Sequence, residues 1–283
     1  LYVLLDNMTF APGFPLNLGD KIQSEPAVYN YEGEKIILTG CKDNNFYAFN
    51  YDDASLRFVV TTGDDVYTSP SFDKNGNIYF GSDDGNIYAV DVNGNMLNGF
   101  PLNVGSAIVG SVVFSDLIGD GSECMVVGTN YGDIYAFDSA LNLLDYFPVG
   151  YQFGVSSSPQ IIDLDNDGDL EIMAGTSGDL LVIDVKSTVL NDQGHWALFK
   201  GDLSRTGNFI YDGSSSGSCE NPELGDINCD EVIDIIDIIS MMNIILGDAS
   251  EYTEYQLWAA DLTGDDIIDI IDIITIVNLI LDS

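Results

Sequence analysis

The sequence predicts a mainly β fold, with β-propeller-like four-stranded blades that are incomplete at the N-terminus, followed by a small all-α domain. Two repeats predict it. Related segments recur through most of the chain at a period that suits four-stranded blades, and a different, shorter repeat occupies the C-terminal end. We therefore expect a blade domain at residues 1–210, a Gly/Ser-rich linker at 211–223 and a second domain at 224–283.

The N-terminal segment matches the outer half of a blade. It reads LYVLLDN and then GFPLNLG, and the same plan returns as IYAVDVNGNMLNGFPLNVG from Ile87. We expect the chain to begin inside a blade whose inner strands come from upstream sequence or from another molecule, because an open strand edge is a sticky surface.

Four later segments share one plan, a strand that ends in Gly, a polar turn, and a strand of alternating apolar residues that ends near Asp. Their equivalent positions lie 41, 47 and 46 residues apart, at Tyr47, Tyr88, Tyr135 and Leu181. Each is preceded by a short stretch such as SEPAV from Ser24 or TSPSF from Thr68. These stretches predict the innermost strand of each blade.

One blade carries an acidic loop, DLDNDGDLE, with a Gly at its tight turn. Hard oxygen ligands at alternate positions suit Ca²⁺. The predicted site consists of Asp163, Asp165, Asp167, Asp169 and Glu171. A related stretch, DLIGDGSE from Asp116, is one residue shorter and is expected to be a structural turn.

These blades resemble the quinoprotein-type (PQQ-like) and FG-GAP/VCBS propeller repeats of secreted bacterial proteins. The resemblance implies that position 7 of the acidic loop, Asp169, supplies its carbonyl to calcium. The later stretch HWALFKGDLSRTGN is similar to the segment that often ends such propellers. The sequence shows no quinone site, so Ca²⁺ is the only cofactor that we expect.

The C-terminal repeat has a period of 35 residues: GDINCDEVIDIIDIISMMNIIL from Gly225 returns as ADLTGDDIIDIIDIITIVNLIL from Ala260. Each copy places oxygen-bearing side chains at positions 1, 3, 5, 9 and 12 and runs directly into an Ile-rich helix. With the carbonyl of position 7, this pattern suits calcium. The predicted ligands are Asp226, Asn228, Asp230, Val232, Asp234 and Asp237 in the first loop and Asp261, Thr263, Asp265, Ile267, Asp269 and Asp272 in the second.

Solvated acidic turns before helices would explain one such loop, because Asp is favoured in a first helical turn. Two copies in matching register favour metal loops instead. Since Thr263 is a weaker ligand than Asp or Asn, we expect weaker Ca²⁺ binding in the second loop. A paired EF-hand is a further alternative, but Pro222 and Gly225 argue against a helix that enters the first loop.

A loop plus exiting helix, duplicated with Asp at position 12, resembles a dockerin, the module that binds cohesin domains in cellulosome-type assemblies. The resemblance covers Leu224 to the end of the chain, although Glu231 and Asp266 replace the usual Gly of position 6. It implies a partner surface on the two exiting helices, where more apolar side chains lie than a small domain can bury. The candidate partner residues are Ile235, Ile236, Met242, Ile270, Ile271 and Val277. Mutual burial of the helices is the alternative for part of this set.

Composition points to an extracellular or cell-surface setting. The chain has 8 Lys and Arg against 46 Asp and Glu, and its net charge of −38 repels nucleic acid and anionic membranes. Weak calcium sites fill at the high Ca²⁺ levels outside cells. Cys219 and Cys229 bracket the start of the first C-terminal loop and are candidates for a disulfide, or else are free thiols. No catalytic constellation can be built around the single His195. A glycosidase-like pair of carboxylates is the alternative, but the calcium loops already explain many of the acidic residues, so no enzymatic activity is expected.

These observations predict a secreted, calcium-stabilised, non-catalytic binding and assembly protein. Its dockerin-like domain would dock onto a cohesin-like domain, and its blades would recognise a ligand such as a glycan or a protein. The alternative is a structural subunit of an extracellular fibre, in which the calcium helices or the open blade edge bind a neighbouring copy of the same protein.

Overall fold

The computed structural model describes residues 1–283 except for 6, 32, 166–167, 186–195, 202–204, 206, 212–223, 228–232, 234, 247–253, 265–266 and 283. The chain divides into two compact units, Leu1–Gly213 and Ser214–Ser283. In its described residues the first unit contains strands and no helix, whereas the second contains helices. Across the described ranges, no helix has the length and apolar character needed to cross a membrane.

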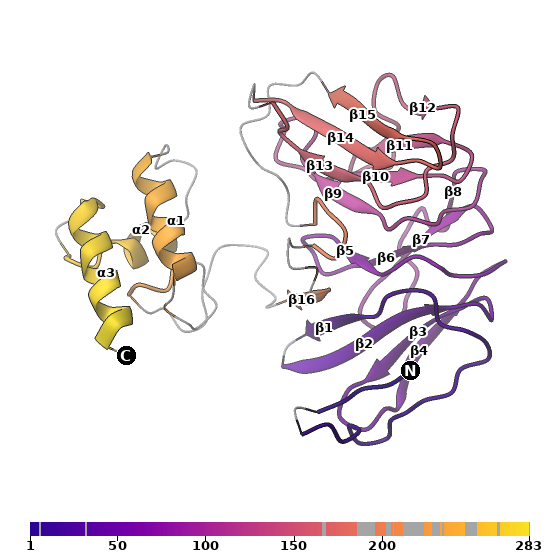
Figure 1. The fold of residues 1–283 in the computed structure, drawn as a ribbon, viewed down its shortest axis with the longest axis horizontal. Coiled ribbons are helices and arrows are strands. Elements are labelled where there is room, and N and C mark those ends of the chain that lie inside the picture. Colours follow the sequence, from indigo (N-terminus) through magenta and orange to yellow (C-terminus); the bar gives the residue numbers. More distant parts are fainter. Residues whose placement is uncertain are drawn as a thin grey trace. The chain divides into compact units, whose positions relative to one another are not determined.

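In the first unit, strands that follow one another in the chain form successive antiparallel sheets, and one later strand joins the first sheet in parallel (Figure 1). The first contains β1 (Ala27–Tyr31), β2 (Glu34–Cys41), β3 (Asn45–Asn50) and β4 (Leu56–Thr61). The second contains β5 (Ser71–Phe72), β6 (Ile78–Gly81), β7 (Asn86–Val90) and β8 (Leu102–Asn103). The third contains β9 (Val113–Ser115), β10 (Cys124–Gly128), β11 (Asp133–Phe137) and β12 (Val149–Gly150). Among the described residues the fourth has three strands, β13 (Gln160–Ile162), β14 (Leu170–Gly175) and β15 (Leu180–Val185).

This arrangement confirms the prediction of a mainly β chain with four-stranded antiparallel sheets. The aligned positions Tyr47, Tyr88, Tyr135 and Leu181 all lie on the third strand of their sheets, β3, β7, β11 and β15. The short stretches before each repeat form the first strands, β1, β5, β9 and β13. The sequence period therefore corresponds to one sheet.

The N-terminal segment has the backbone pairing of an outer half-blade. Leu4 bridges Phe10, just as Val90 bridges Met96 in the second sheet. The N–H of Leu16 donates to the carbonyl of Leu1 at 2.9 Å, which closes the segment as an outer strand does. Its apolar side chains join a small core with the first sheet, whose buried members are Ala11, Phe14, Ile37 and Ala54.

Successive sheets pack on one another through aromatic and branched side chains. The rings of Phe46 on β3 and Phe80 on β6 stack with centroids 4.0 Å apart. Tyr79 on β6 meets Phe114 on β9 edge to face at 4.8 Å. A second buried cluster joins the third sheet to the fourth and includes Val113, Val126, Ile161 and Ile172. Alternating apolar positions therefore form the contacts between sheets.

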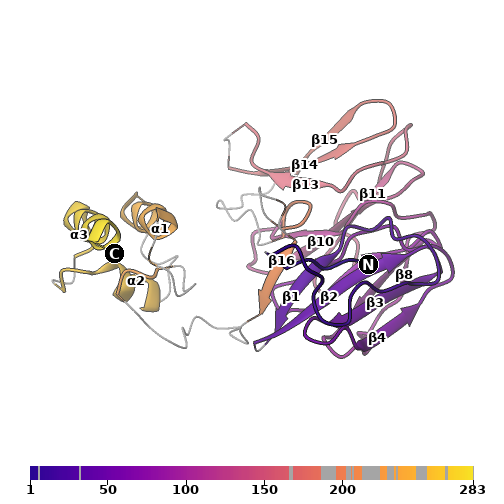
Figure 2. The same cartoon turned by 60° about the horizontal axis from the view of Figure 1, so that its bottom comes forward.

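A closing segment, Trp196–Gly201 and β16 (Asn208–Tyr211), lies along the first strands of three sheets. The N–H of Phe114 donates to the Trp196 carbonyl at 3.0 Å, and the N–H of Ile161 donates to the Ala197 carbonyl at 2.8 Å. Strand β16 pairs in parallel with β1, so the first sheet has five strands rather than the four expected (Figure 2). This pairing joins the last described strand of the unit to its first, and no strand pattern in the sequence predicted it.

The second unit contains α1 (Ile235–Leu246), α2 (Glu254–Ala260) and α3 (Ile270–Asp282). Helices α1 and α3 begin 35 residues apart, at the same point of the two repeats. Their apolar side chains form a core with α2, whose buried members are Ile227, Met241, Ile244, Ala259, Ala260 and Ile276. Helix α2 was not predicted from the sequence; it is short, and its apolar residues gather at its C-terminal end.

Replacing Gly81 by Ala tests the packing between the second sheet and the segment that connects β8 to β9. A Cβ on Gly81 would lie 2.4 Å from Cγ2 of Ile108, so we expect the free energy of unfolding to fall by about 1–3 kcal/mol. Urea unfolding of the full chain measures this loss. The double variant Gly81→Ala/Ile108→Ala removes the shortest contact, that with Cγ2, and leaves Cβ of residue 108 at 2.7 Å. It should therefore lose less than the sum of the single variants. Strictly additive losses would contradict this account.

Candidate metal centres

The second unit buries three of its predicted calcium ligands. Asp226 is 1 % exposed, and Asp237 and Asp272 are fully buried. Oδ1 of Asp237 accepts the N–H of Ile227 at 2.8 Å. Oδ1 of Asp272 accepts the N–H of Thr263 at 3.0 Å, and its Oδ2 accepts the N–H of Asp269 at 2.9 Å. In both repeats the position-12 carboxylate thus ties the start of the loop to the start of the exiting helix.

No basic side chain of this unit can neutralise these carboxylates. Arg205 is the last Lys, Arg or His in the sequence, and it precedes the second unit, which begins at Ser214. A buried ionised carboxylate is costly unless a counter-charge is bound nearby. Calcium would supply that charge and accept the oxygen ligands that the loops carry.

The other loop residues are more exposed. Asp261 and Asp269 are half-buried, Thr263 is exposed, and the side chain of Ile267 is 60 % exposed. Oδ1 of Asp261 accepts the N–H of Gly264 at 2.8 Å, where the backbone turns through φ +70°. Five predicted ligands, Asn228, Asp230, Val232, Asp234 and Asp265, lie outside the described residues.

The predicted partner residues on the helices are largely at the surface. The exposed fractions of Met242, Ile270 and Ile271 are 42 %, 67 % and 55 %, and Val277 is half-buried. The side chains of Ile235 and Ile236 are not among those described. Further apolar side chains, Ile245, Ile274 and Leu279, are also exposed on α1 and α3. Part of the Ile-rich surface is therefore left over after the helices have packed on each other.

The acidic loop of the first unit also brings predicted ligands together. Asp163, Asp165 and Glu171 can each place one carboxylate oxygen within 4.8 Å of the others. Oδ1 of Asp163 is buried and has no hydrogen-bond partner, while Oε2 of Glu171 accepts the N–H of Leu164 at 2.6 Å. Asp169 and Glu171 are buried, at 9 % and 4 % exposure, and Asp167 lies outside the described residues.

The structure adds Asp184 to this centre. Asp184 lies on β15 directly opposite Glu171 on β14, and its carboxylate joins those of Asp169 and Glu171 within the same 4.8 Å limit. Sequence reasoning missed it because it lies 13 residues beyond the loop. The only signal in the sequence was the repeated pair of strands. It predicts a hairpin between β14 and β15, in which Glu171 and Asp184 can lie opposite each other.

The stretch from Asp116 forms a turn, as expected. Oδ1 of Asp116 accepts the N–H groups of Ile118, Gly119 and Asp120, and Oδ2 accepts that of Gly121. Both oxygens are therefore engaged by the backbone of the turn.

Two cysteines are described, and both are free and buried: Cys41 and Cys124. Burial raises the pKa of Cys124 to about 11, which leaves this thiol protonated at neutral pH. The candidate disulfide residues Cys219 and Cys229 lie outside the described residues.

No protein-family model matches the chain, and no curated protein matches it. Three solved structures illustrate its structural likenesses. They are the computationally designed Ika4 protein (20% identity, TM-score 0.42, 60% of this chain and 94% of that chain), BamB from Moraxella catarrhalis (17%, 0.44, 60% and 48%) and BBS1N in complex with ARL6DN (14%, 0.46, 62% and 55%). The chain spans about half the length of the last two. These likenesses are too weak to support an argument about function.

Replacing Asp237 by Asn tests the first calcium loop. The substitution removes the charge of a fully buried carboxylate, so we expect Ca²⁺ affinity at one site to fall roughly tenfold or more in calorimetric titration of the full chain. The matched control is Asp73→Asn, because Asp73 is also buried but its oxygens accept turn N–H groups and the Tyr79 hydroxyl. Unchanged affinity in Asp237→Asn, or an equal loss in both variants, would contradict the assignment.

Proposed function

We propose that this chain is a calcium-stabilised, non-catalytic binding and assembly protein of the extracellular space. In this proposal the helical unit binds Ca²⁺ and docks onto a cohesin-like partner domain, and the sheets of the first unit recognise a ligand. The proposal is supported by one observation above all: the second unit buries Asp226, Asp237 and Asp272 and contains no basic side chain.

The observation supports metal binding because it occurs in both copies of the C-terminal repeat. Asp237 and Asp272 occupy equivalent positions, and both accept backbone N–H groups from the start of their loops. A chance acidic turn would not be expected to bury the same carboxylate twice at equivalent points. A divalent cation in each loop would make the unit's fold depend on calcium.

The exposed isoleucines support the docking role. Ile270 and Ile271 are positions 10 and 11 of the second loop and also the first two residues of α3. Calcium that orders the loop would therefore also position the apolar side chains that a partner contacts. The dockerin resemblance adds a partner class, the cohesin domain.

Removing calcium should reduce the helicity of the protein. We expect EGTA to lower the helical circular dichroism of the full chain reversibly, because α1 and α3 start at the buried loop carboxylates. Restoring Ca²⁺ should recover the signal, whereas Mg²⁺ at the same concentration should recover less of it. Unchanged spectra in EGTA and in Ca²⁺ would contradict calcium-dependent folding.

Replacing Ile271 by Asp tests the docking surface. A charge at this exposed position should weaken binding to a panel of purified cohesin domains by about tenfold or more while leaving Ca²⁺ uptake unchanged. The matched control is Val182→Asp, an exposed apolar position on β15 of the first unit.

Size-exclusion chromatography of the wild type distinguishes docking from the fibre alternative. A Ca²⁺-dependent polymer that forms without any cohesin, and that Ile271→Asp disperses, would replace the docking proposal by that of a fibre subunit. Failure of every cohesin to bind a calcium-loaded monomer would contradict docking.

A further inference from the structure

The two arginines of the chain have contrasting environments. Nε of Arg57 donates to the Val92 carbonyl at 3.1 Å, and Nη1 forms an ion pair with Oε2 of Glu34 at 2.8 Å. Arg205 is exposed, and no hydrogen bond or ion pair engages its guanidinium among the residues that the structure describes. In a chain with 46 acidic residues, an arginine that pairs with no carboxylate of the described part of the chain calls for a separate explanation.

Arg205 lines a pocket of about 500 Å³ in the first unit. Segments that precede the first strands of all four sheets meet the closing segment here. The lining is rich in hydroxyl and amide groups and includes two aromatic rings; its members include Gln23, Tyr67, Ser156, Gln160 and Phe199. Pockets of this size and mixed character accommodate small ligands.

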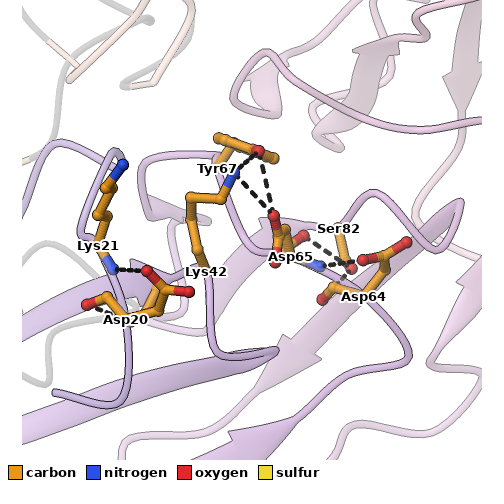
Figure 3. A network of polar contacts seen from close by, with 8 residues as sticks. Asp20, Lys21, Lys42, Asp64, Asp65, Tyr67 and Ser82 are labelled. Atoms are coloured by element: carbon orange, nitrogen blue, oxygen red, sulfur yellow. Dashed lines mark hydrogen bonds and ion pairs between the residues drawn. The ribbon is translucent and has the colours of Figure 1, made fainter.

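The ring of Tyr67 is held in place before any ligand arrives (Figure 3). Its hydroxyl donates to Oδ2 of Asp65 at 3.1 Å and accepts a hydrogen bond from Nζ of Lys42. Lys42 is itself paired with Asp65 at 3.1 Å, and these two partners raise the pKa of its ammonium group above the usual value. Because the Tyr67 side chain is already ordered, it loses less conformational entropy when a ligand binds.

The charges at the pocket favour a ligand with a carboxylate. Glu25 also lines the pocket, but Nζ of Lys200 pairs with its Oε2 at 3.0 Å. Of the two charged residues that line the pocket, Arg205 is then the one that no described residue balances. A guanidinium recognises a carboxylate through two parallel hydrogen bonds. The net charge of −38 does not prevent this, because charges farther away than about 8–10 Å are screened at physiological salt.

We propose that this pocket binds a carboxylated saccharide, a sugar of the uronic acid class, with Arg205 as the partner of its carboxylate. The hydroxyl and amide groups of the lining would bind sugar hydroxyls, and Tyr67 and Phe199 would contact the apolar faces of the ring. This names a ligand class for the recognition role proposed above for the first unit, on which it rests. It does not depend on docking by the second unit.

Titrations of the full chain in the presence of Ca²⁺ test the proposal with two matched pairs of sugars. The probes are D-glucuronate against D-glucose and D-galacturonate against D-galactose. We expect the wild type to bind at least one uronate about tenfold more tightly than its neutral counterpart. Arg205→Gln should abolish that preference, and Arg57→Gln, with the same change in charge, should retain it.

Several outcomes would overturn the proposal. They are no binding of either uronate, a preference for the neutral sugars, or the same effect in both arginine variants. Binding of acetate or of a glutamate-rich peptide as tight as that of the uronates would show that the pocket recognises a carboxylate without the sugar. Cohesin binding measured on the same samples keeps the two proposals separate, since either can fail while the other stands.

Discussion

The excess of carboxylates over cations is the constraint on which the rest of this structure depends. With 46 acidic and 8 basic side chains, most carboxylates cannot find a salt-bridge partner. The first unit uses many of them as hydrogen-bond acceptors for its own backbone. Oδ1 of Asp91 accepts the N–H groups of Asn93 and Asn95, and Oδ1 of Asp138 does the same for Ala140 and Asn142. These carboxylates therefore stabilise turns at equivalent points of successive sheets by hydrogen bonds and need no salt-bridge partner.

Carboxylates that accept hydrogen bonds also link neighbouring repeats. Oδ2 of Asp84 accepts the N–H of Gly63, which follows the first sheet, at 2.7 Å and the hydroxyl of Tyr88 at 2.6 Å. Burial and this carboxylate raise the pKa of Tyr88 to about 12, so the hydroxyl stays a donor at neutral pH. Asp43 repeats the arrangement one sheet earlier, with the N–H of Gly19 and the hydroxyl of Tyr47. Each of these two carboxylates thus joins the preceding segment to the third strand of its own sheet.

Local periodicity made much of the fold predictable. Alternating apolar residues and the spacing of Tyr47, Tyr88 and Tyr135 predicted the third strands because each strand's pattern lies within its own few residues. The parallel pairing of β16 with β1 could not be predicted in the same way, because it joins positions about 180 residues apart and depends on how the sheets are arranged. Helix α2 was missed for a related reason. Its carbonyl at Ala259 accepts the N–H of Gly225, so its place depends on a contact with the first loop.

For the candidate sites too, local spacing was predictable from the sequence and long-range contacts were not. Spacing identified the loop carboxylates, but it could not find Asp184, which reaches Glu171 only across the β14–β15 pairing. Nor could spacing show that Asp226, Asp237 and Asp272 are buried, since burial follows from the packing of α1, α2 and α3 around them. Sequence therefore supplies candidate ligands, and tertiary structure decides which of their oxygens lie close together.

The two acidic stretches of the first unit differ in whether the backbone occupies both oxygens of the first Asp. In the stretch from Asp116, four N–H groups occupy both oxygens of the first Asp, and Oε2 of Glu123 accepts the N–H of Lys74. The loop from Asp163 is one residue longer, and Oδ1 of its first Asp is buried without a hydrogen-bond partner. A buried oxygen that gains no hydrogen bond costs free energy unless something else binds it. The stretch from Asp116 therefore satisfies its own first carboxylate, whereas the loop from Asp163, which is one residue longer and has Asp165 in place of Ile118, leaves a buried oxygen that a cation could bind.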